Sequence, residues 1–225
     1  MKLILSRHGN TFGPGDKVTW VGRRTDLTLT AEGCRQAQDL GNALCQSGAM
    51  LGGIYCGPLR RTRQYAEIIV ERIGAAPVPI VDSRLAEIDY GAWEGLSSQE
   101  IITQFGREEF EGWERSGAWP ESSGWSPSEA TLAHGVTTFV GQLARTHRED
   151  SAVLAVTSNG VLRYFLRLAG NSLNGKVGTG HICILEVLQG KCRVHAWNIA
   201  PDPDHLSELL SKALRMGPTD TTSSP

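Results

Sequence analysis

Four short segments of the sequence hold residue types that together could handle a phosphate group. Arg7 and His8 stand side by side near the start, and residues 158–160 read Ser-Asn-Gly. Arg61 and Glu87 lie in two further segments between them. Guanidinium groups and the backbone amides at a helix N-terminus hold phosphate dianions. A neutral histidine can attack phosphorus, and a protonated glutamate can supply the proton that a leaving group needs. These residue types indicate phosphoryl-transfer chemistry.

The elements that the sequence predicts would bring these segments to one edge of a sheet. Apolar runs bounded by turn residues predict strands at residues 2–6, 53–56, 78–81, 152–157, 181–188 and 192–197. Helical spacing of apolar residues predicts helices at 30–48, 60–73 and 160–169. In an open parallel sheet the ligand crevice lies outside the carboxyl ends of the strands. Each of the four segments follows the end of a predicted strand, so we expect them to converge.

Two capping patterns predict further helix starts. Ser97 and Glu100 form a predicted capping box. Residues 126–129, Ser-Pro-Ser-Glu, predict a second box with Pro127 at the first helical position, for a helix that runs to about residue 147. Residues 106–126 hold three tryptophans without clear periodicity. We expect them to form either a structured excursion that serves as a lid or a long surface loop that its aromatic side chains hold down.

Strands that alternate with helices indicate an α/β fold, with helices on both faces of a mostly parallel, doubly wound sheet. Residues 188–191 separate two predicted strands and indicate a hairpin, so we expect one antiparallel edge strand. We find neither an internal repeat nor a linker. We therefore expect a single domain over residues 1–216, followed by a disordered Thr/Ser/Pro-rich tail at 217–225.

The composition argues against several classes of partner. The 225 residues include 22 Lys+Arg and 24 Asp+Glu, a net charge of -2, which provides no basic field for a nucleic-acid backbone. Apolar runs fall short of the roughly 20 residues of a membrane-spanning helix, and charge at Arg7 comes too early for a signal peptide. We expect a cytoplasmic protein without nucleic-acid or membrane partners. The five scattered cysteines lack metal-type spacing, and we expect reduced thiols, no metal and no cofactor.

Motifs along nearly the whole chain, in the same order, resemble those of the histidine phosphatase superfamily, the phosphoglycerate mutase-like group. Residues 7–11, Arg-His-Gly-Asn-Thr, are similar to its Arg-His-Gly-x-Thr. Residues 22–30 and 58–66 resemble its Gly-x-x-Thr-Asp-x-x-Leu-Thr and Pro-Leu-x-Arg-Ala-x-Gln-Thr-Ala segments. Residues 85–95 resemble its Leu-x-Glu-x-x-x-Gly-x-x-Glu-Gly stretch, and Thr179 with Gly180 precedes the late strand as in the mutase branch. The resemblance implies a three-layer α/β/α sandwich.

The resemblance also implies a role for each matched residue. His8 would be the nucleophile that takes the phosphoryl group, and Arg7 and Arg61 would bind its oxygens. Glu87 would be the general acid. Two nearby guanidinium groups would lower the pKa of His8 and keep it neutral, and they would stabilise the charge of the transition state. Glu87 must hold a proton near neutral pH, which burial or a phosphate neighbour would allow by raising its pKa.

Three further residues are candidates for phosphate binding. Asn10 could donate from its side-chain amide, or it could be a turn residue that stabilises its loop. Asn159 stands where most of the family has a second histidine. Its amide donates a hydrogen bond but carries no charge, a loss on the order of 1–2 kcal/mol, or about ten- to thirtyfold in rate. His181, at the mouth of a predicted strand, could replace that histidine or could pack structurally against its neighbours.

The function that we expect is a metal-independent phosphatase that hydrolyses a small phosphomonoester through a phosphohistidine. The alternatives are a mutase-type phosphoryl transferase and a non-catalytic protein that binds a phosphorylated ligand. A mutase would need basic residues for a second phosphate or carboxylate, and residues 106–126 show no obvious basic run. A pure binding protein would need neither His8 nor Glu87. We expect a small phosphorylated metabolite as partner, and the chain could form a homodimer.

Substrate specificity is expected to reside in residues 13–24 and 106–126. Trp20 lies in the first of these segments, and Trp93 follows the acidic motif. Either indole could stack on a base or sugar, and a place in the core is at least as common for tryptophan.

Overall fold

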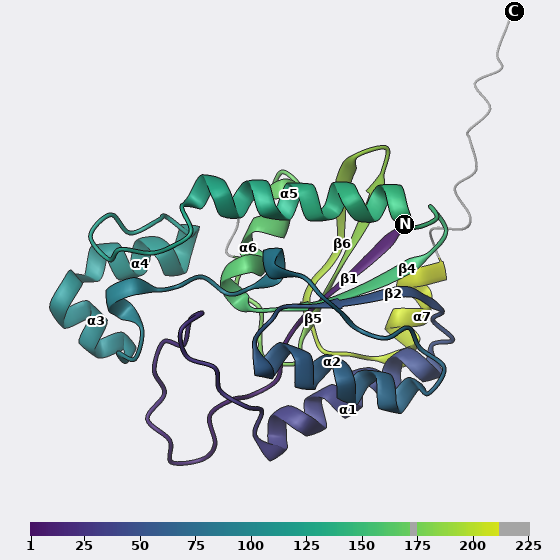
Figure 1. The fold of residues 1–225 in the computed structure, drawn as a ribbon, viewed down its shortest axis with the longest axis horizontal. Coiled ribbons are helices and arrows are strands. Elements are labelled where there is room, and N and C mark those ends of the chain that lie inside the picture. Colours follow the sequence, from purple (N-terminus) through teal and green to yellow (C-terminus); the bar gives the residue numbers. More distant parts are fainter. Residues whose placement is uncertain (172–174, 212–225) are drawn as a thin grey trace, which may run out of the picture.

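One sheet of six strands forms the centre of the structure, in the order β3-β2-β4-β1-β5-β6 (Figure 1). This computed structural model describes residues 1–171 and 175–211. The strands are β1 (Lys2–Arg7), β2 (Leu51–Cys56), β3 (Ile80–Val81), β4 (Ala152–Thr157), β5 (Ile182–Leu188) and β6 (Lys191–Ile199). The helices are α1 (Ala31–Gln46), α2 (Arg60–Ile73), α3 (Ser98–Phe105), α4 (Arg107–Ser116), α5 (Glu129–Thr146), α6 (Asn159–Leu168) and α7 (Pro203–Ser211). The tail expected at residues 217–225 lies outside the described residues.

The sheet is mostly parallel with an antiparallel edge, which confirms the expected topology. β1 pairs with β4, and β2 with both β4 and β3, in parallel. β5 runs antiparallel to β1 and to β6, so the edge consists of a hairpin whose outermost strand is β6. The hairpin turns at Gln189 and Gly190, whose φ angles are 49° and 76°. Two residues of positive φ give a turn whose twist matches that of the flanking strands.

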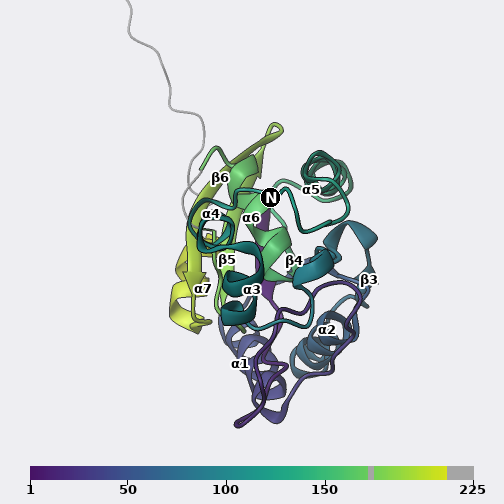
Figure 2. The same ribbon diagram turned by 90° about the vertical axis from the view of Figure 1, so that its left-hand side faces the viewer.

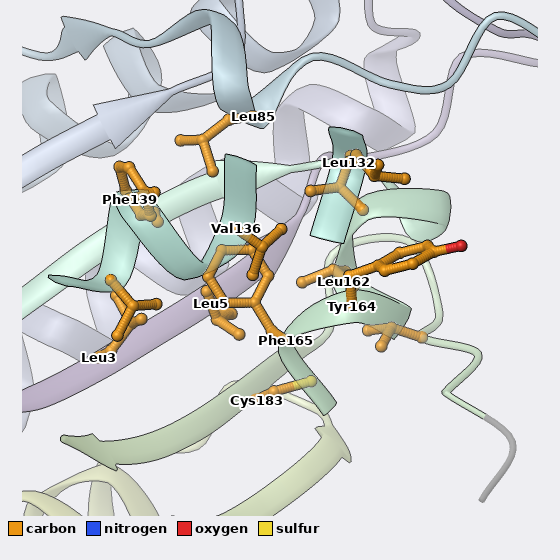
Figure 3. Close-up of a cluster of buried hydrophobic side chains, with 14 of the residues drawn as sticks. Leu3, Leu5, Leu85, Leu132, Val136, Phe139, Leu162, Tyr164, Phe165 and Cys183 are labelled. Carbon is orange, nitrogen blue, oxygen red and sulfur yellow. The ribbon is translucent and has the colours of Figure 1, made fainter. Parts of the chain in front are cut away.

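Alternating side chains of β1 build the two cores. Leu3 and Leu5 point to one face, where they pack with Phe139 of α5 and Phe165 of α6 (Figure 3). Ile4 points to the opposite face and belongs to the cluster beneath α1, α2 and α7. A strand places successive side chains on opposite faces. Helices therefore cover both sides of the sheet, as Figure 2 shows, and the three-layer α/β/α arrangement is confirmed.

The first predicted capping box forms as expected. The Ser97 hydroxyl accepts from the amide of Glu100 at 3.3 Å, and the Glu100 carboxylate accepts from the amide of Ser97 at 2.8 Å. This exchange satisfies two amide donors at the start of α3.

The second predicted capping box is wrong. The helix α5 begins at Glu129, and Ser128 is its N-cap, with a hydroxyl that accepts from the amide of Thr131 at 3.2 Å. Ser126 cannot cap this helix because both its backbone groups pair with Asp89, at 2.9 and 3.0 Å. Pro127 therefore precedes the helix rather than opening it.

Residues 106–126 are a structured excursion that contains a helix, α4, which the sequence analysis did not anticipate. α3 and α4 lie together beyond one end of the sheet (Figure 1). Trp113 and Trp125 are buried there, with ring centroids 4.7 Å apart. The guanidinium of Arg163 in α6 lies 4.6 Å over the Trp113 ring, and its Nη1 donates to the Trp113 carbonyl at 2.8 Å. Aromatic packing and a buried cation thus fix the excursion to the main body.

Two expectations from composition can be compared with the structure. Within the part of the chain that the structure describes, every helix is too short or too polar to cross a membrane. The five cysteines all lie in that part and are free thiols, as expected.

Trp93 is fully buried in the core. Of the two roles predicted for its indole, stacking on a ligand or packing in the core, the structure therefore shows the second.

Candidate active site

A cavity of about 420 Å³ lies at the carboxyl ends of β1 and β4. Six of the seven predicted site residues line it: Arg7, His8, Asn10, Arg61, Glu87 and Asn159. They come from four separate segments of the chain. The sheet brings them together because parallel strands end at the same edge. The volume lies within the range of small-molecule sites.

His8 is held by backbone contacts at the end of β1. Its amide donates to the carbonyl of Thr157 in β4 at 3.1 Å, which continues the parallel pairing by one residue. The ring Nδ1 lies 2.8 Å from the carbonyl oxygen of Gly9. A carbonyl can only accept, so Nδ1 carries the proton of the neutral ring and Nε2 keeps its lone pair. In the neutral ring, Nε2 is therefore the nitrogen with an available lone pair.

The site favours the uncharged form of His8. Burial lowers the pKa of His8 well below its ordinary value, and the positive charges of Arg61 and Arg7 lower it further. The hydrogen bond to Gly9 acts in the opposite direction and is the weakest influence. A neutral imidazole at cellular pH is the form that can attack phosphorus.

The two arginines are fixed through carbonyl oxygens. Arg61 is buried and donates from Nη1 to Thr25 at 2.8 Å and from Nη2 to Gly22 at 3.1 Å. Arg7 donates from Nη1 to the carbonyl of Val177 at 2.6 Å. The Nε of Arg7 is buried and has no hydrogen-bond partner among the residues that the structure describes. A buried donor without an acceptor costs about 1–3 kcal/mol, and a phosphate oxygen in the cavity would remove that cost.

Glu87 is a buried carboxyl group with backbone donors on both oxygens. Oε1 accepts from the amide of Ile88 at 2.9 Å, and Oε2 accepts from the amide of Gly160 at 3.3 Å. Burial raises the pKa of Glu87, although those two amides and both arginines act in the opposite direction. Burial raises the pKa of Tyr90, and the nearby carboxyl group of Glu87 raises it further. Glu87 is therefore biased towards the protonated form that a general acid requires.

The two asparagines in the cavity each use the side-chain oxygen for a structural bond. Asn159 Oδ1 accepts from the amide of Val177 at 2.8 Å. Asn10 Oδ1 accepts from the hydroxyl of Thr179 and, at 3.4 Å, from Gln36. Each amide nitrogen is then the end of the side chain that can donate to a ligand. Asn10 also stabilises its loop, since its carbonyl accepts from the amide of Thr30 at 2.9 Å.

His181 does not line the cavity. Its ring Nδ1 pairs with Asn198 Oδ1 at 2.9 Å, and its carbonyl accepts from the amide of Arg7 at 3.1 Å. The ring therefore contributes to the start of the β5–β6 hairpin. Its backbone, rather than its side chain, is the part that serves the site.

Several lining residues were not singled out by sequence reasoning. Tyr90 could have been noticed, since it stands three residues after Glu87 in the same motif. Glu114 and Lys176 carry no sequence signal, because they meet only through the packing of the excursion against residues 175–179. Trp20 lines the cavity from the segment expected to determine specificity.

Comparison with known proteins now places the chain. The family model described as histidine phosphatase superfamily (branch 1) matches residues 3–200, and the chain belongs to that superfamily. The 2,3-bisphosphoglycerate-dependent phosphoglycerate mutase of Corynebacterium diphtheriae is 36% identical over 118 residues, which is 51% of this chain and 46% of that protein. The same enzyme of Leifsonia xyli is 34% identical over 117 residues, 51% of this chain and 45% of that protein. The chain spans about half the length of the curated relatives it matches.

Solved structures share the fold over a larger part of the chain. YhfR of Bacillus stearothermophilus is 26% identical, covers 87% of this chain and 95% of its own, and has a TM-score of 0.69. The mycobacterial glucosyl-3-phosphoglycerate phosphatase is 24% identical, covers 88% and 99%, and has a TM-score of 0.74. A putative alpha-ribazole-5'-P phosphatase of Escherichia coli is 23% identical, covers 90% and 98%, and has a TM-score of 0.67. At these identities the last two show the fold alone.

Proposed function

We propose that this chain is a phosphatase that hydrolyses a small phosphomonoester through a phosphohistidine at His8, without a metal ion. The observation that carries the proposal is the state of His8: burial and two arginines lower its pKa, and Gly9 holds Nδ1–H. A non-catalytic binding site would have no need for an imidazole kept neutral with the lone pair on Nε2.

In the first step, Nε2 of His8 forms a bond to phosphorus as the bond from phosphorus to the ester oxygen breaks. Arg61 and Arg7 stabilise the charge on the phosphoryl oxygens as it passes between them. Their guanidinium groups are already held by the carbonyls of Thr25, Gly22 and Val177. Such fixed donors need little reorganisation when the transition state forms.

Glu87 would transfer its proton to the departing alkoxide oxygen and would itself become a carboxylate. In the second step it would take a proton from a water molecule that attacks the phosphohistidine. This step releases inorganic phosphate and restores both His8 and protonated Glu87. Burial, which raises the pKa of Glu87, supports the acid role, and the arginines support the carboxylate that follows.

Asn159 would donate from its amide nitrogen to the phosphoryl group, with Asn10 as a second neutral donor. The bond from Val177 to Asn159 Oδ1 supports this orientation of the amide. Because neither side chain carries charge, the arginines would supply the positive charge at the phosphate.

Hydrolysis is favoured over a mutase reaction by the charges in the cavity. A mutase acting on a phosphorylated acid would need cations for a second anionic group. Among the described lining residues, Lys176 is the one further cation besides Arg7 and Arg61, and it is paired with Glu114 at 2.7 Å.

The cytoplasmic location and the homodimer remain predictions.

The test is phosphate release from a panel of small phosphomonoesters in the presence of a chelator. Wild type should release phosphate, and His8→Ala should not. Met50→Ser, an exposed position away from the cavity, is the matched control and should behave as wild type. Conversion of phosphoglycerate to its isomer without phosphate release would favour the mutase. Tight phosphate binding without turnover of any ester would favour the binding protein.

A further inference from the structure

The loop after the nucleophile gives the cavity an apolar wall. Phe12, Val18, Trp20 and Val21 line it from this loop, and Tyr90 lines it from the segment after Glu87. The rings of Trp20 and Tyr90 contact edge to face, with centroids 5.1 Å apart. Val18 is 65% exposed although it lines the cavity. A ligand larger than phosphate would cover these surfaces, and burial of apolar area would stabilise its binding.

The same wall is held in place by α3 and by α4 of the excursion. Trp20 Nε1 donates to the hydroxyl of Ser98 at 3.2 Å, and Lys17 pairs with Glu100 at 2.7 Å. Trp20 also lies 5.9 Å from Phe110 of α4, centroid to centroid. The apolar surface is therefore present before a ligand arrives, which reduces the entropy lost on binding.

One ion pair makes up the charge of the described cavity lining beyond the phosphate-binding and catalytic residues. Among the described lining residues, the charged groups outside the phosphate-binding and catalytic set are Glu114 and Lys176, and they pair at 2.7 Å. Glu114 also lies 3.5 Å from Nη2 of the buried Arg163. An anionic substituent on the alcohol part of the ester would approach the Glu114 carboxylate. It would also compete with that carboxylate for Lys176. An uncharged group would meet no such penalty.

We propose that the substrate is the phosphate ester of an uncharged alcohol with an apolar or aromatic body. This inference rests on the proposed function and specifies its substrate class. The phosphate lies between Arg7 and Arg61, and the body of the alcohol packs on Trp20 and Val18. The Glu114–Lys176 pair disfavours esters that carry a carboxylate. A cavity of about 420 Å³ has room for a ring beside the phosphate.

The experiment measures binding separately from turnover. Isothermal titration calorimetry on the His8→Ala variant compares benzyl phosphate with 3-phosphoglycerate, so neither ester is consumed. We expect benzyl phosphate to bind at least tenfold more tightly. Val18→Ser in the same background should weaken benzyl phosphate about three- to tenfold. Glu114→Gln should strengthen 3-phosphoglycerate severalfold and leave benzyl phosphate unchanged. Met50→Ser should change neither affinity, and melting curves confirm that each variant folds.

The outcomes separate this inference from the proposed function. If 3-phosphoglycerate binds as tightly as benzyl phosphate, or if Val18→Ser leaves the benzyl phosphate affinity unchanged, the substrate class is wrong while a phosphatase can still be observed in wild type. If benzyl phosphate binds selectively and wild type hydrolyses no ester, the ligand class holds and the hydrolytic function fails. If neither ester binds the variant or the wild type, both are overturned.

Discussion

Gly160 lies directly against the carboxyl group of Glu87. Its amide donates to Oε2 at 3.3 Å, and a Cβ built on Gly160 would lie 2.4 Å from Oε1. The second position of α6 is therefore part of the site, because only glycine leaves space for the carboxyl group there. The helix start both donates to the carboxyl group of Glu87 and limits its position.

Gly160→Ala tests this contact. Alanine suits a helix, so the helix itself should form, but the carboxyl group of Glu87 must move. We expect kcat to fall by at least tenfold, with a smaller change in the affinity for inorganic phosphate. Gly141→Ala in α5, where the nearest atom to a Cβ is Arg145 Nη1 at 3.6 Å, is the matched control and should keep full activity. Equal kcat values in both variants would show that Glu87 is not constrained by Gly160.

Glu87→Gln removes the proposed proton donor while keeping its shape. For an alkyl phosphate, whose leaving oxygen needs a proton, kcat should fall by about 10²–10⁴-fold. For a nitrophenyl phosphate, whose leaving group departs without protonation, the first step should be much less affected. A kinetic comparison of the two esters measures this difference. A uniform loss on both esters would argue for a binding role instead of acid catalysis.

The pH dependence of kcat/KM should be set by the pKa values of two groups, which are shifted in opposite directions. His8 must be unprotonated, and burial with Arg61 and Arg7 lowers its pKa, so the decline on the acid side should lie below about pH 6.5. Glu87 must be protonated, and burial raises its pKa, so activity should be lost as the pH rises through that raised value. In Glu87→Gln the alkaline decline should disappear. A wild-type profile that climbs through pH 6.5 like an ordinary histidine would contradict the account of His8.

Asn159→His tests the neutral donor. A histidine there could form a charge-assisted bond, and turnover should rise severalfold, to at most about thirtyfold. Asn159→Ala removes both the donor and the acceptor for Val177, so its activity should fall below wild type. Steady-state rates on one ester and melting temperatures decide the question. An unchanged rate in a folded Asn159→His variant would mean that this position does not contact the phosphoryl group.

Much of this arrangement could be predicted because local patterns fix it. The helix at Arg60–Ile73 and the strand at Ala152–Thr157 lie where apolar spacing predicts them. The places of Arg7 and Glu87 in the site could be predicted because each comes after a predicted strand. Predictions from local patterns were wrong where tertiary contacts determine the structure. Ser126 gives up its capping role to pair with Asp89. The helix α4 carried signals that were overlooked: acidic residues in its first turn and Gly117, with φ 67°, at its end.

The rest of the site depends on contacts between distant segments. Asn198 lies 17 residues from His181 and pairs with its ring, so the position of that histidine could not be read from its place beside Thr179 and Gly180. The Glu114–Lys176 pair joins residues that are 62 apart in sequence. Neither contact leaves a periodic or compositional mark, because long-range packing alone creates it.

If His8 carries the phosphoryl group during the reaction, trapping that group is the most direct test. Wild type and Glu87→Gln are mixed with nitrophenyl phosphate, quenched in alkali and digested, and the peptides are examined by mass spectrometry. We expect an acid-labile, alkali-stable phosphoryl group on His8, more abundant in Glu87→Gln because water activation is slowed, and absent from His8→Ala. Release of phosphate by wild type with no label on His8 in either protein, or with the label on another residue, would contradict this expectation.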